Sequence, residues 1–100
     1  MKKARFVAAA RREFLAEILY YNQEQPGLGA RFTAAVEDAT ARATAFPLAG
    51  SIATENTRKV LLKGFPFAVV YRPLENGILV FAVAHYSRRP GYWESRVQDR

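Results

Sequence analysis

The sequence predicts an α+β domain in which an antiparallel two-helix hairpin packs on one face of a small antiparallel β-sheet. Two patterns predict it. Apolar residues recur at helical spacing between residues 9 and 46, and they alternate with polar ones, as in a strand, from residue 58 onwards. Half of the 100 residues are hydrophobic, which is enough for residues 1–100 to form one domain around its own core.

An N-terminal strand and a first helix are expected at the start of the chain. Residues 4–8 are typical of a short strand, and helical spacing runs from about Ala9 to Gln23. Four apolar side chains of this helix are expected to share one face: Phe14, Leu15, Ile18 and Leu19. Residues 25–29, with one proline and two glycines, then break the helix.

A second helix is expected from about Leu28 to Ala45, and Pro47 stops it. Its apolar residues follow one another at steps of one, three or four, which places them on a single face. They are Leu28, Phe32, Ala35, Val36, Ala39, Ala43 and Phe46. Because only a short break separates the two helices, they are expected to form an antiparallel hairpin.

Three strands are expected in the second half of the chain, after a loop at residues 47–57. Polar and apolar residues alternate over residues 58–63, and residues 67–72 are rich in valine and aromatic side chains. Pro73 is expected to end this strand, and an Asn-Gly turn leads into the next one. That third strand, residues 78–84, is apolar on both faces and is therefore expected to lie centrally or under the helices.

The core is expected between the hairpin and the sheet. Four side chains from the helical stripe and the apolar strands are expected to be buried there: Phe32, Val36, Val70 and Phe81. The opposite face of the sheet is left with side chains of the basic strands.

The positive charge is concentrated in the second half of the chain. The net charge is +6, and residues 58–93 hold six basic side chains against Glu75 alone. A surface of one sign attracts and holds anionic partners such as phosphate backbones or acidic protein segments. The alternative is a solvated basic face that only keeps the protein soluble, and the uneven distribution disfavours it.

Composition argues against several classes of protein. The chain has no cysteine, which excludes disulfides, thiol chemistry and zinc–thiolate sites and fits a reducing, cytoplasmic compartment. No signal peptide is expected, because Arg11, Arg12 and Glu13 interrupt the apolar residues after the basic N-terminus. The longest apolar run, residues 78–84, is too short to cross a bilayer, so no membrane partner is expected.

Chemistry on a small metabolite is poorly supported. The sequence has no glycine-rich phosphate-binding or dinucleotide-binding motif and no calcium-binding or zinc-protease motif. Its one histidine, His85, has no acidic cluster beside it, and no Ser-His-Asp constellation can be argued. No cofactor, metal or small-molecule substrate is therefore expected.

The segment His85–Trp93 is the strongest candidate for a functional surface. It follows the most apolar strand and combines two arginines and an imidazole with the aromatic rings of Tyr86, Tyr92 and Trp93. Arginines suit phosphate or carboxylate oxygens, and aromatic rings stack on bases or anchor a protein interface. In the alternative interpretation, Trp93 covers the open end of the core. His85 then has a structural role, with a hydrogen bond to the segment that follows it.

The order of several segments resembles the RelE/ParE superfamily, the toxin halves of bacterial type II toxin–antitoxin pairs. The resembling segments cover nearly the whole chain: Tyr20-Tyr21, Pro26-Gly27-Leu28-Gly29, Arg31-Phe32, Arg58-Lys59-Val60-Leu61-Leu62, Phe65-Pro66-Phe67-Ala68-Val69-Val70-Tyr71-Arg72, Val83-Ala84-His85 and Arg88-Arg89-Pro90-Gly91-Tyr92-Trp93. The family fold is the one that the hydrophobic pattern predicts. The resemblance also implies a toxin that a cognate antitoxin neutralises.

The resemblance implies one of two targets. RelE-like members cleave mRNA on the ribosome, whereas ParE-like members poison DNA gyrase and have no hydrolytic chemistry of their own. RelE-like members commonly carry an arginine just before the Val-Tyr of the middle strand, where this chain has Ala68 or Val69. The ending Arg88–Trp93 is closer to ParE-like sequences, so the resemblance favours a gyrase poison. The alternatives are a ribosome-dependent mRNA endonuclease and a non-toxic adaptor of the same fold that binds an acidic protein segment.

Two sets of residues carry these hypotheses. Binding to the target or the antitoxin is assigned to Arg58, Lys59, Arg72, Arg88, Arg89, Tyr92 and Trp93. For a ribonuclease, proton transfer and charge stabilisation are assigned to His85, Arg88, Lys59 and Lys63. The antitoxin is expected to be a partly disordered acidic peptide that folds into an apolar groove or adds a strand to an open sheet edge.

Overall fold

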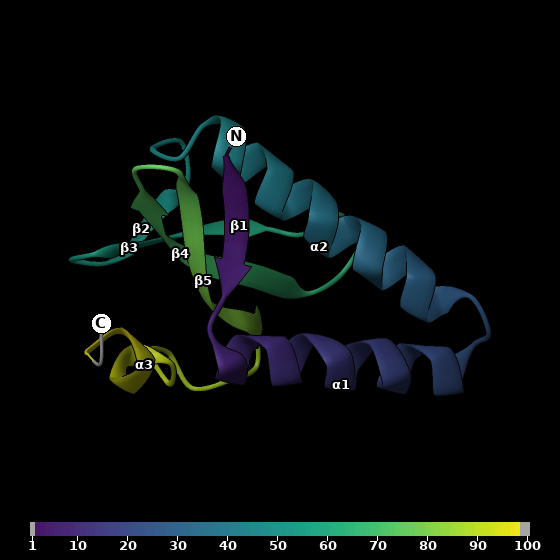
Figure 1. The fold of residues 1–100 in the computed structure, drawn as a ribbon. Helices are drawn as coiled ribbons and strands as arrows, with labels where there is room; N and C mark the ends of the chain where they lie inside the picture. Colours follow the sequence, from purple (N-terminus) through teal and green to yellow (C-terminus); the bar gives the residue numbers. More distant parts are fainter. Residues whose placement is uncertain (1, 99–100) are drawn as a thin grey trace.

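The computed structural model describes residues 2–98, which form a five-stranded sheet and three helices (Figure 1). In chain order the elements are β1 (Lys3–Phe6), α1 (Ala8–Glu24), α2 (Leu28–Ala45), β2 (Ser51–Thr54), β3 (Thr57–Leu61), β4 (Phe67–Leu74), β5 (Gly77–His85) and α3 (Glu94–Gln98). The predicted α+β fold is confirmed. None of the described helices is long and apolar enough to cross a membrane.

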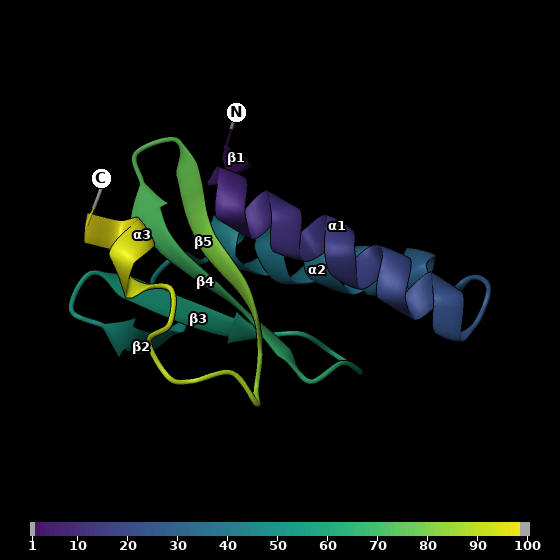
Figure 2. The ribbon, with the colours of Figure 1, turned by 90° about the horizontal axis from the view of Figure 1, so that it is seen from below.

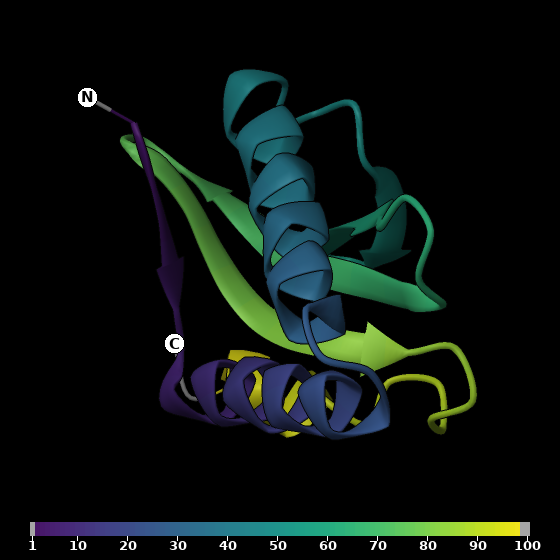
Figure 3. The same cartoon turned by 90° about the vertical axis from the view of Figure 1, so that its right-hand side faces the viewer.

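Both predicted helices are confirmed, α1 to within one residue at each end and α2 at the same bounds. They diverge from the loop that joins them, α2 across the sheet and α1 along its end (Figure 3). The two helices pack tightly beside Gly29, where a Cβ atom would lie 2.7 Å from the carbonyl oxygen of Ile18. The side-chain oxygen of Asn22 accepts the Gly29 N–H at 3.0 Å, so the last turns of α1 hold the first turn of α2.

Three apolar side chains of the predicted helical faces do not pack in the core. Leu15 and Leu19 of α1 are 54% and 65% exposed, and Phe46, just after α2, is 69% exposed. The sheet contacts of α1 are mainly with one strand, β5, so only a narrow stripe of the helix faces inward. This stripe consists of Ala10, Phe14, Ile18 and Tyr21.

The strands are arranged in the order β1-β5-β4-β3-β2, with β1 parallel to β5 and the other pairs antiparallel. β2 lies in the segment that was predicted as a loop. It is short and pairs only with β3. Pro73 does not end β4 as predicted, since it pairs with Ile78 of β5. The pairing of β4 with β3 stops at Tyr71. On that side of β4 no residue of β3 therefore needs a hydrogen bond from position 73, and a proline, which has no N–H, is tolerated there.

The N-terminal strand reaches β5 because of one glycine. Gly77 has a φ of 143°, and a Cβ atom on it would lie 1.8 Å from the carbonyl oxygen of Lys3. Only a residue without a side chain lets the two backbones approach so closely in this conformation. β1 and β5 then pair in parallel as far as Phe6 and Val80.

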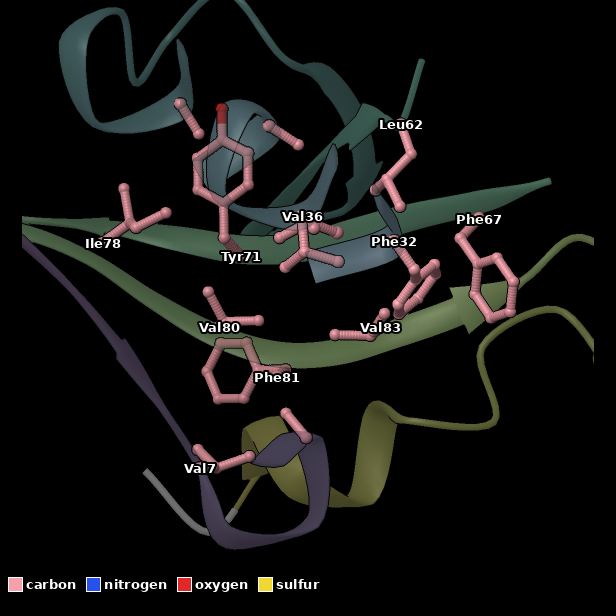
Figure 4. Packing of buried hydrophobic residues seen from close by; sticks show 14 residues of the cluster. Val7, Phe32, Val36, Leu62, Phe67, Tyr71, Ile78, Val80, Phe81 and Val83 are labelled. Atoms are coloured by element: carbon pink, nitrogen blue, oxygen red, sulfur yellow. The ribbon is translucent and has the colours of Figure 1, made fainter. Parts of the chain in front are cut away.

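The main core lies on the face of the sheet that α2 covers (Figure 4). Phe32 and Val36 of α2 pack there against alternate residues of β4, namely Phe67, Val69 and Tyr71. Tyr71 is fully buried, and its hydroxyl donates a hydrogen bond to the carbonyl oxygen of Pro47 at 2.7 Å, which satisfies its polar end. The predicted burial of Phe32, Val36 and Phe81 is confirmed.

A second, smaller cluster lies on the opposite face of the sheet, and it was not predicted. Its buried members are Val70 of β4, Ala82 of β5 and Trp93 of the C-terminal segment. Val70 is therefore buried as predicted but on the other face, because residues 69 and 70 point to opposite sides of a strand. Residues 86–98, which we call the tail, cross this face in front of β3 and β4 (Figure 2).

Candidate functional site

The tail and the sheet face beneath it enclose an open cleft of about 400 Å³. Its floor is formed by small side chains of the two longest strands: Ala68, Val70 and Ala84. The tail forms one wall, with Tyr86, Arg88–Trp93 and the end of β5 at His85, and the other wall is formed by Ile52, Ala53 and Lys59 of β2 and β3.

The cleft exists because residue size alternates along β4. Phe67, Val69 and Tyr71 fill the core under α2, while Ala68 and Val70 between them point to the tail face. β5 contributes Ala82 and Ala84 to that same face. The large side chain that is buried against these small ones is Trp93, which is only 6% exposed, and the floor beside it stays hollow.

The cleft gathers positive charge. Lys59 points into it from β3, and Arg88 and Arg89 line it from the tail. Among the described residues that line it, none is acidic. Like charges that surround a partly enclosed hollow reinforce one another's field, so the cleft attracts anionic groups of a partner.

Arg88 is held in position although half of its side chain is exposed. Its guanidinium lies over the ring of Tyr92, 3.8 Å from the ring centroid. The nearest carboxylate oxygen, Oε2 of Glu13, is 4.0 Å away, so this contact is long for an ion pair. A guanidinium that stacks on an aromatic ring keeps its N–H groups free to bind a carboxylate or a phosphate.

His85 lies at the end of β5, with its ring edge-on to Phe67 at 4.9 Å between ring centroids. Its Nδ1 accepts the backbone N–H of Ser87 at 2.9 Å, which fixes the neutral ring with its proton on Nε2. The Ser87 hydroxyl is 2.8 Å from the same nitrogen. The predicted hydrogen bond between this histidine and the segment that follows it is present.

The tail is anchored by residues that the sequence did not single out. Glu13 of α1 accepts hydrogen bonds from the Tyr92 hydroxyl at 2.7 Å and from both terminal nitrogens of Arg96 at 3.0 Å. Burial of the phenol, together with the hydrogen bond and negative charge of Glu13, raises the pKa of Tyr92 far above its usual value. Burial alone would lower the pKa of Arg96, but the bonds and charge of Glu13 outweigh it and raise that pKa.

Three of the cations assigned from the sequence lie outside the cleft. Arg58 donates hydrogen bonds to the carbonyl oxygens of Leu48 and Gly50 at 3.0 and 2.9 Å, so it supports the loop after α2. Arg72 lies over the ring of Phe81 at 5.3 Å. Lys63 is exposed beyond the end of β3. The cleft itself brings together Lys59, Arg88, Arg89, Tyr92 and Trp93 from the binding set, with His85.

A protein-family model described as the ParE toxin of the type II toxin–antitoxin system, parDE, matches residues 4–90. The chain belongs to this ParE toxin family. The matched residues include all five strands and the tail as far as Pro90, so they contain the cleft floor and both cleft arginines. Of the two branches of the superfamily that the sequence resembles, the match is to the ParE branch.

Solved structures agree with the fold. A chain of the structure described as the chromosomal ParDE TA system from P. aeruginosa superimposes with a TM-score of 0.71. The similarity covers 85% of this chain and 96% of that one, at 13% sequence identity. No curated protein matches the sequence. The chain is thus a ParE-like toxin of a type II toxin–antitoxin system, a class that acts together with a cognate antitoxin.

Proposed function

We propose that this ParE-like toxin arrests growth by poisoning DNA gyrase, and that it binds its target with the cationic cleft. The observation that carries the proposal is the gathering of Lys59, Arg88 and Arg89 around one hollow with no carboxylate among its described lining residues. Family membership supports gyrase rather than the ribosome as the target. The sequence supports it too, since Ala68 or Val69 stands where RelE-like toxins commonly have an arginine.

Arg88 and Arg89 carry most of the proposed binding. Both follow a rigid strand directly and both are exposed, so they reach a partner without disturbing the core. Losing one charged hydrogen-bond partner from a desolvated contact costs about 2–5 kcal/mol. That loss weakens affinity by roughly tenfold at least, whereas an exposed substitution changes folding stability by only about 0.5 kcal/mol.

The test is induced expression of the double variant Arg88→Ala/Arg89→Ala, compared with the wild-type toxin. The matched control is Arg11→Ala/Arg12→Ala, which removes an adjacent, exposed arginine pair from α1. We expect the tail variant to lose growth arrest and the control to keep it, with unchanged circular dichroism in both. DNA breaks should accumulate in cells that express the wild-type toxin, while transcripts stay intact. Full toxicity of a folded tail variant would contradict the proposed site.

Neutralisation by an antitoxin follows from the same surface. Ile52 on the edge strand β2 and Leu61 on β3 are 70% and 52% exposed, and Lys59 of β3 lines the cleft beside them. We propose that an acidic, partly disordered antitoxin segment covers these apolar side chains and pairs with the cleft cations. Binding should weaken with added salt, and the charge reversals Lys59→Glu, Arg88→Glu and Arg89→Glu together should abolish it. Unchanged affinity in that triple variant would exclude this mode of binding.

Cleavage of mRNA is a second candidate, because the cleft also places His85 with Lys59 and Arg88. Cutting RNA through the 2′-hydroxyl needs a base, an acid and a cation for the charge on phosphorus. The variant His85→Gln separates the two candidates. A ribonuclease that uses the imidazole for proton transfer would lose most cleavage and still bind the ribosome, whereas a gyrase poison should keep most of its toxicity.

A further inference from the structure

One carboxylate holds three separate parts of the chain together. Glu13 Oε1 accepts the backbone N–H of Val83 at 3.1 Å and the Arg96 guanidinium at 3.0 Å. Its Oε2 accepts the Tyr92 hydroxyl at 2.7 Å and the second Arg96 nitrogen at 3.0 Å. The Glu13 side chain is only 16% exposed, and bonds to a charged, shielded group are stronger than those between neutral partners.

Glu13 and Arg96 occupy the place of a missing strand. β1 pairs with β5 only as far as Val80, so within residues 2–98 no strand lies beside the edge of β5 beyond that residue. The pairing of β4 with β5 is irregular just beyond this point: the neighbouring residues Val70 and Tyr71 pair with Ala82 and Val80, which are not neighbours. Two backbone groups of this open stretch are satisfied by side chains, the Val83 N–H by Glu13 and the Phe81 carbonyl by Arg96 at 2.9 Å.

The same contacts lead to the cleft. Glu13 holds the hydroxyl of Tyr92, and the ring of Tyr92 carries the guanidinium of Arg88 at 3.8 Å. Arg96 lies over that ring as well, at 5.2 Å. Tyr92 and Arg88 both line the cleft, but Glu13 does not. An effect of Glu13 on the cleft therefore passes through residues of the tail: through Tyr92, or through Arg88 itself, whose guanidinium lies 4.0 Å from Glu13 Oε2.

We propose that Glu13 is a positioning residue of this toxin, which docks the tail on the open edge of β5 and so sets Arg88 in the target-binding cleft. The inference rests on the proposed function, because it assumes that the cleft binds the target. It assigns to a carboxylate on the first helix a role in an activity whose proposed binding arginines, Arg88 and Arg89, come 75 and 76 positions later in the chain.

Trp93 reports on tail docking directly. It is the only tryptophan of the chain, it lies in the tail, and it is buried against Val70 and Ala82. In Glu13→Ala we expect its fluorescence to shift to longer wavelength and to become accessible to acrylamide, while the far-ultraviolet circular dichroism stays as in the wild type. The matched control is Asp38→Ala, which removes an exposed helical carboxylate with a single ion-pair partner, Arg42. It should change neither signal.

Activity is then measured as growth arrest and as binding to purified gyrase. Glu13→Ala should lose roughly tenfold or more in affinity, as Arg88→Ala does, although Arg96 is freed and no cation is removed. Tyr92→Phe keeps the ring under Arg88 but loses the hydroxyl bond to Glu13, so its affinity should fall between that of the wild type and that of Glu13→Ala. In an Arg88→Ala background, Glu13→Ala should cost little further affinity, because the effect of Glu13 on binding is proposed to act through the Arg88 side chain. If the losses of the two substitutions are additive instead, the role of Glu13 is purely structural and the inference is overturned.

The two proposals fail in distinguishable ways. Wild-type Trp93 fluorescence in Glu13→Ala, or full toxicity in that variant with Trp93 exposed, overturns the role of Glu13. Full toxicity of Arg88→Ala/Arg89→Ala with Trp93 still buried overturns the arginine site instead. If Glu13→Ala loses toxicity while Arg88→Ala/Arg89→Ala keeps it, Glu13 remains a positioning residue of the tail, and the contact with the target is assigned to another side chain of the tail.

Discussion

The two faces of the sheet are built from the same strands and differ in almost every other respect. On the α2 face, Phe32 lies within 5.0–6.1 Å, centroid to centroid, of four other aromatic rings: Phe14, Tyr21, Phe65 and Phe67. On the tail face, the buried cluster consists of Val70, Ala82 and Trp93. One face is a filled core, and the other is a floor of small residues with cations around it.

This difference separates stability from binding. Each large apolar side chain that is fully buried contributes about 1.5–3 kcal/mol, and most of these side chains lie on the α2 face. The tail face contributes less burial, so it tolerates a hollow that is lined by positive charge. Because neighbouring residues of a strand point to opposite faces, β4 serves both purposes within five residues, from Phe67 to Tyr71.

The largest expected effect is on the filled face. Phe32→Ala removes a ring that is fully buried among other rings and should lower the free energy of unfolding by about 3–5 kcal/mol. Urea unfolding followed by circular dichroism measures it. Leu19→Ala on the exposed side of α1 is the control and should change stability by about 0.5 kcal/mol or less. A loss below about 1 kcal/mol in Phe32→Ala would show that the face is less tightly packed than described.

A smaller loss of stability is expected on the tail face, with a larger loss of activity. Trp93→Ala should cost about 1.5–3 kcal/mol, because only the docking of the tail is lost. Growth arrest should disappear, while the circular dichroism of the helices and sheet remains. A variant that unfolds completely would show that the two faces are not separable.

The same substitution, alanine to leucine, made on each face of the sheet tests whether the two faces differ in how tightly they are packed. Ala39→Leu enlarges a fully buried residue of α2 and should destabilise the fold by about 1–3 kcal/mol through overpacking. Ala84→Leu enlarges a half-buried residue of the cleft floor, where there is room, so its melting temperature should stay close to that of the wild type. Affinity for the target should fall in Ala84→Leu because the hollow is filled. Equal destabilisation by both substitutions would contradict the description of the cleft.

The smallest effect is a pH dependence of tail docking. The pKa of Tyr92 is raised, by burial and then by Glu13, so the folded protein holds this proton more tightly than the unfolded chain, whose value is 10.0. Its contribution to stability is complete below pH 10.0 and is lost as the pH rises from there towards the higher pKa of the folded state. Trp93 fluorescence should therefore report undocking in alkaline solution. Tyr92→Phe should remove the contribution of Tyr92 to this pH dependence. The contributions of Tyr21 and Tyr71, whose pKa values burial also raises, should remain.

Much of the fold followed from local patterns. The bounds of α1 and α2 came from helical spacing and from the Pro-Gly break between them, and the Asn-Gly turn located the β4–β5 hairpin. β2 was missed because four residues that pair with one strand carry too little alternation to be distinguished from a loop. Helical spacing grouped Leu15 and Leu19 with Phe14 and Ile18 on one face, but it did not show that both leucines would be exposed, because an apolar pair on a helix looks the same whether or not another layer covers it.

The candidate site was found only in part. Lys59, Arg88 and Arg89 were named from charge and composition, and the cleft brings them together. Arg58 was named on the same grounds, but its guanidinium is bound to two carbonyl oxygens of the loop after α2. Charge along a sequence shows that cations are present, and it does not show which of them are already occupied by the protein itself.

The sequence by itself determined α1 and α2, most of the strands, the apolar content of the core and the excess of positive charge, because each depends on residues close together in the chain. Only the tertiary structure decided that the tail folds over the second face, that Val70 and Trp93 meet there, and that Glu13 holds Tyr92 and Arg96. These last partners are 79 and 83 residues away from Glu13. Their contact depends on where α1 passes the end of β1, and no local pattern encodes that crossing.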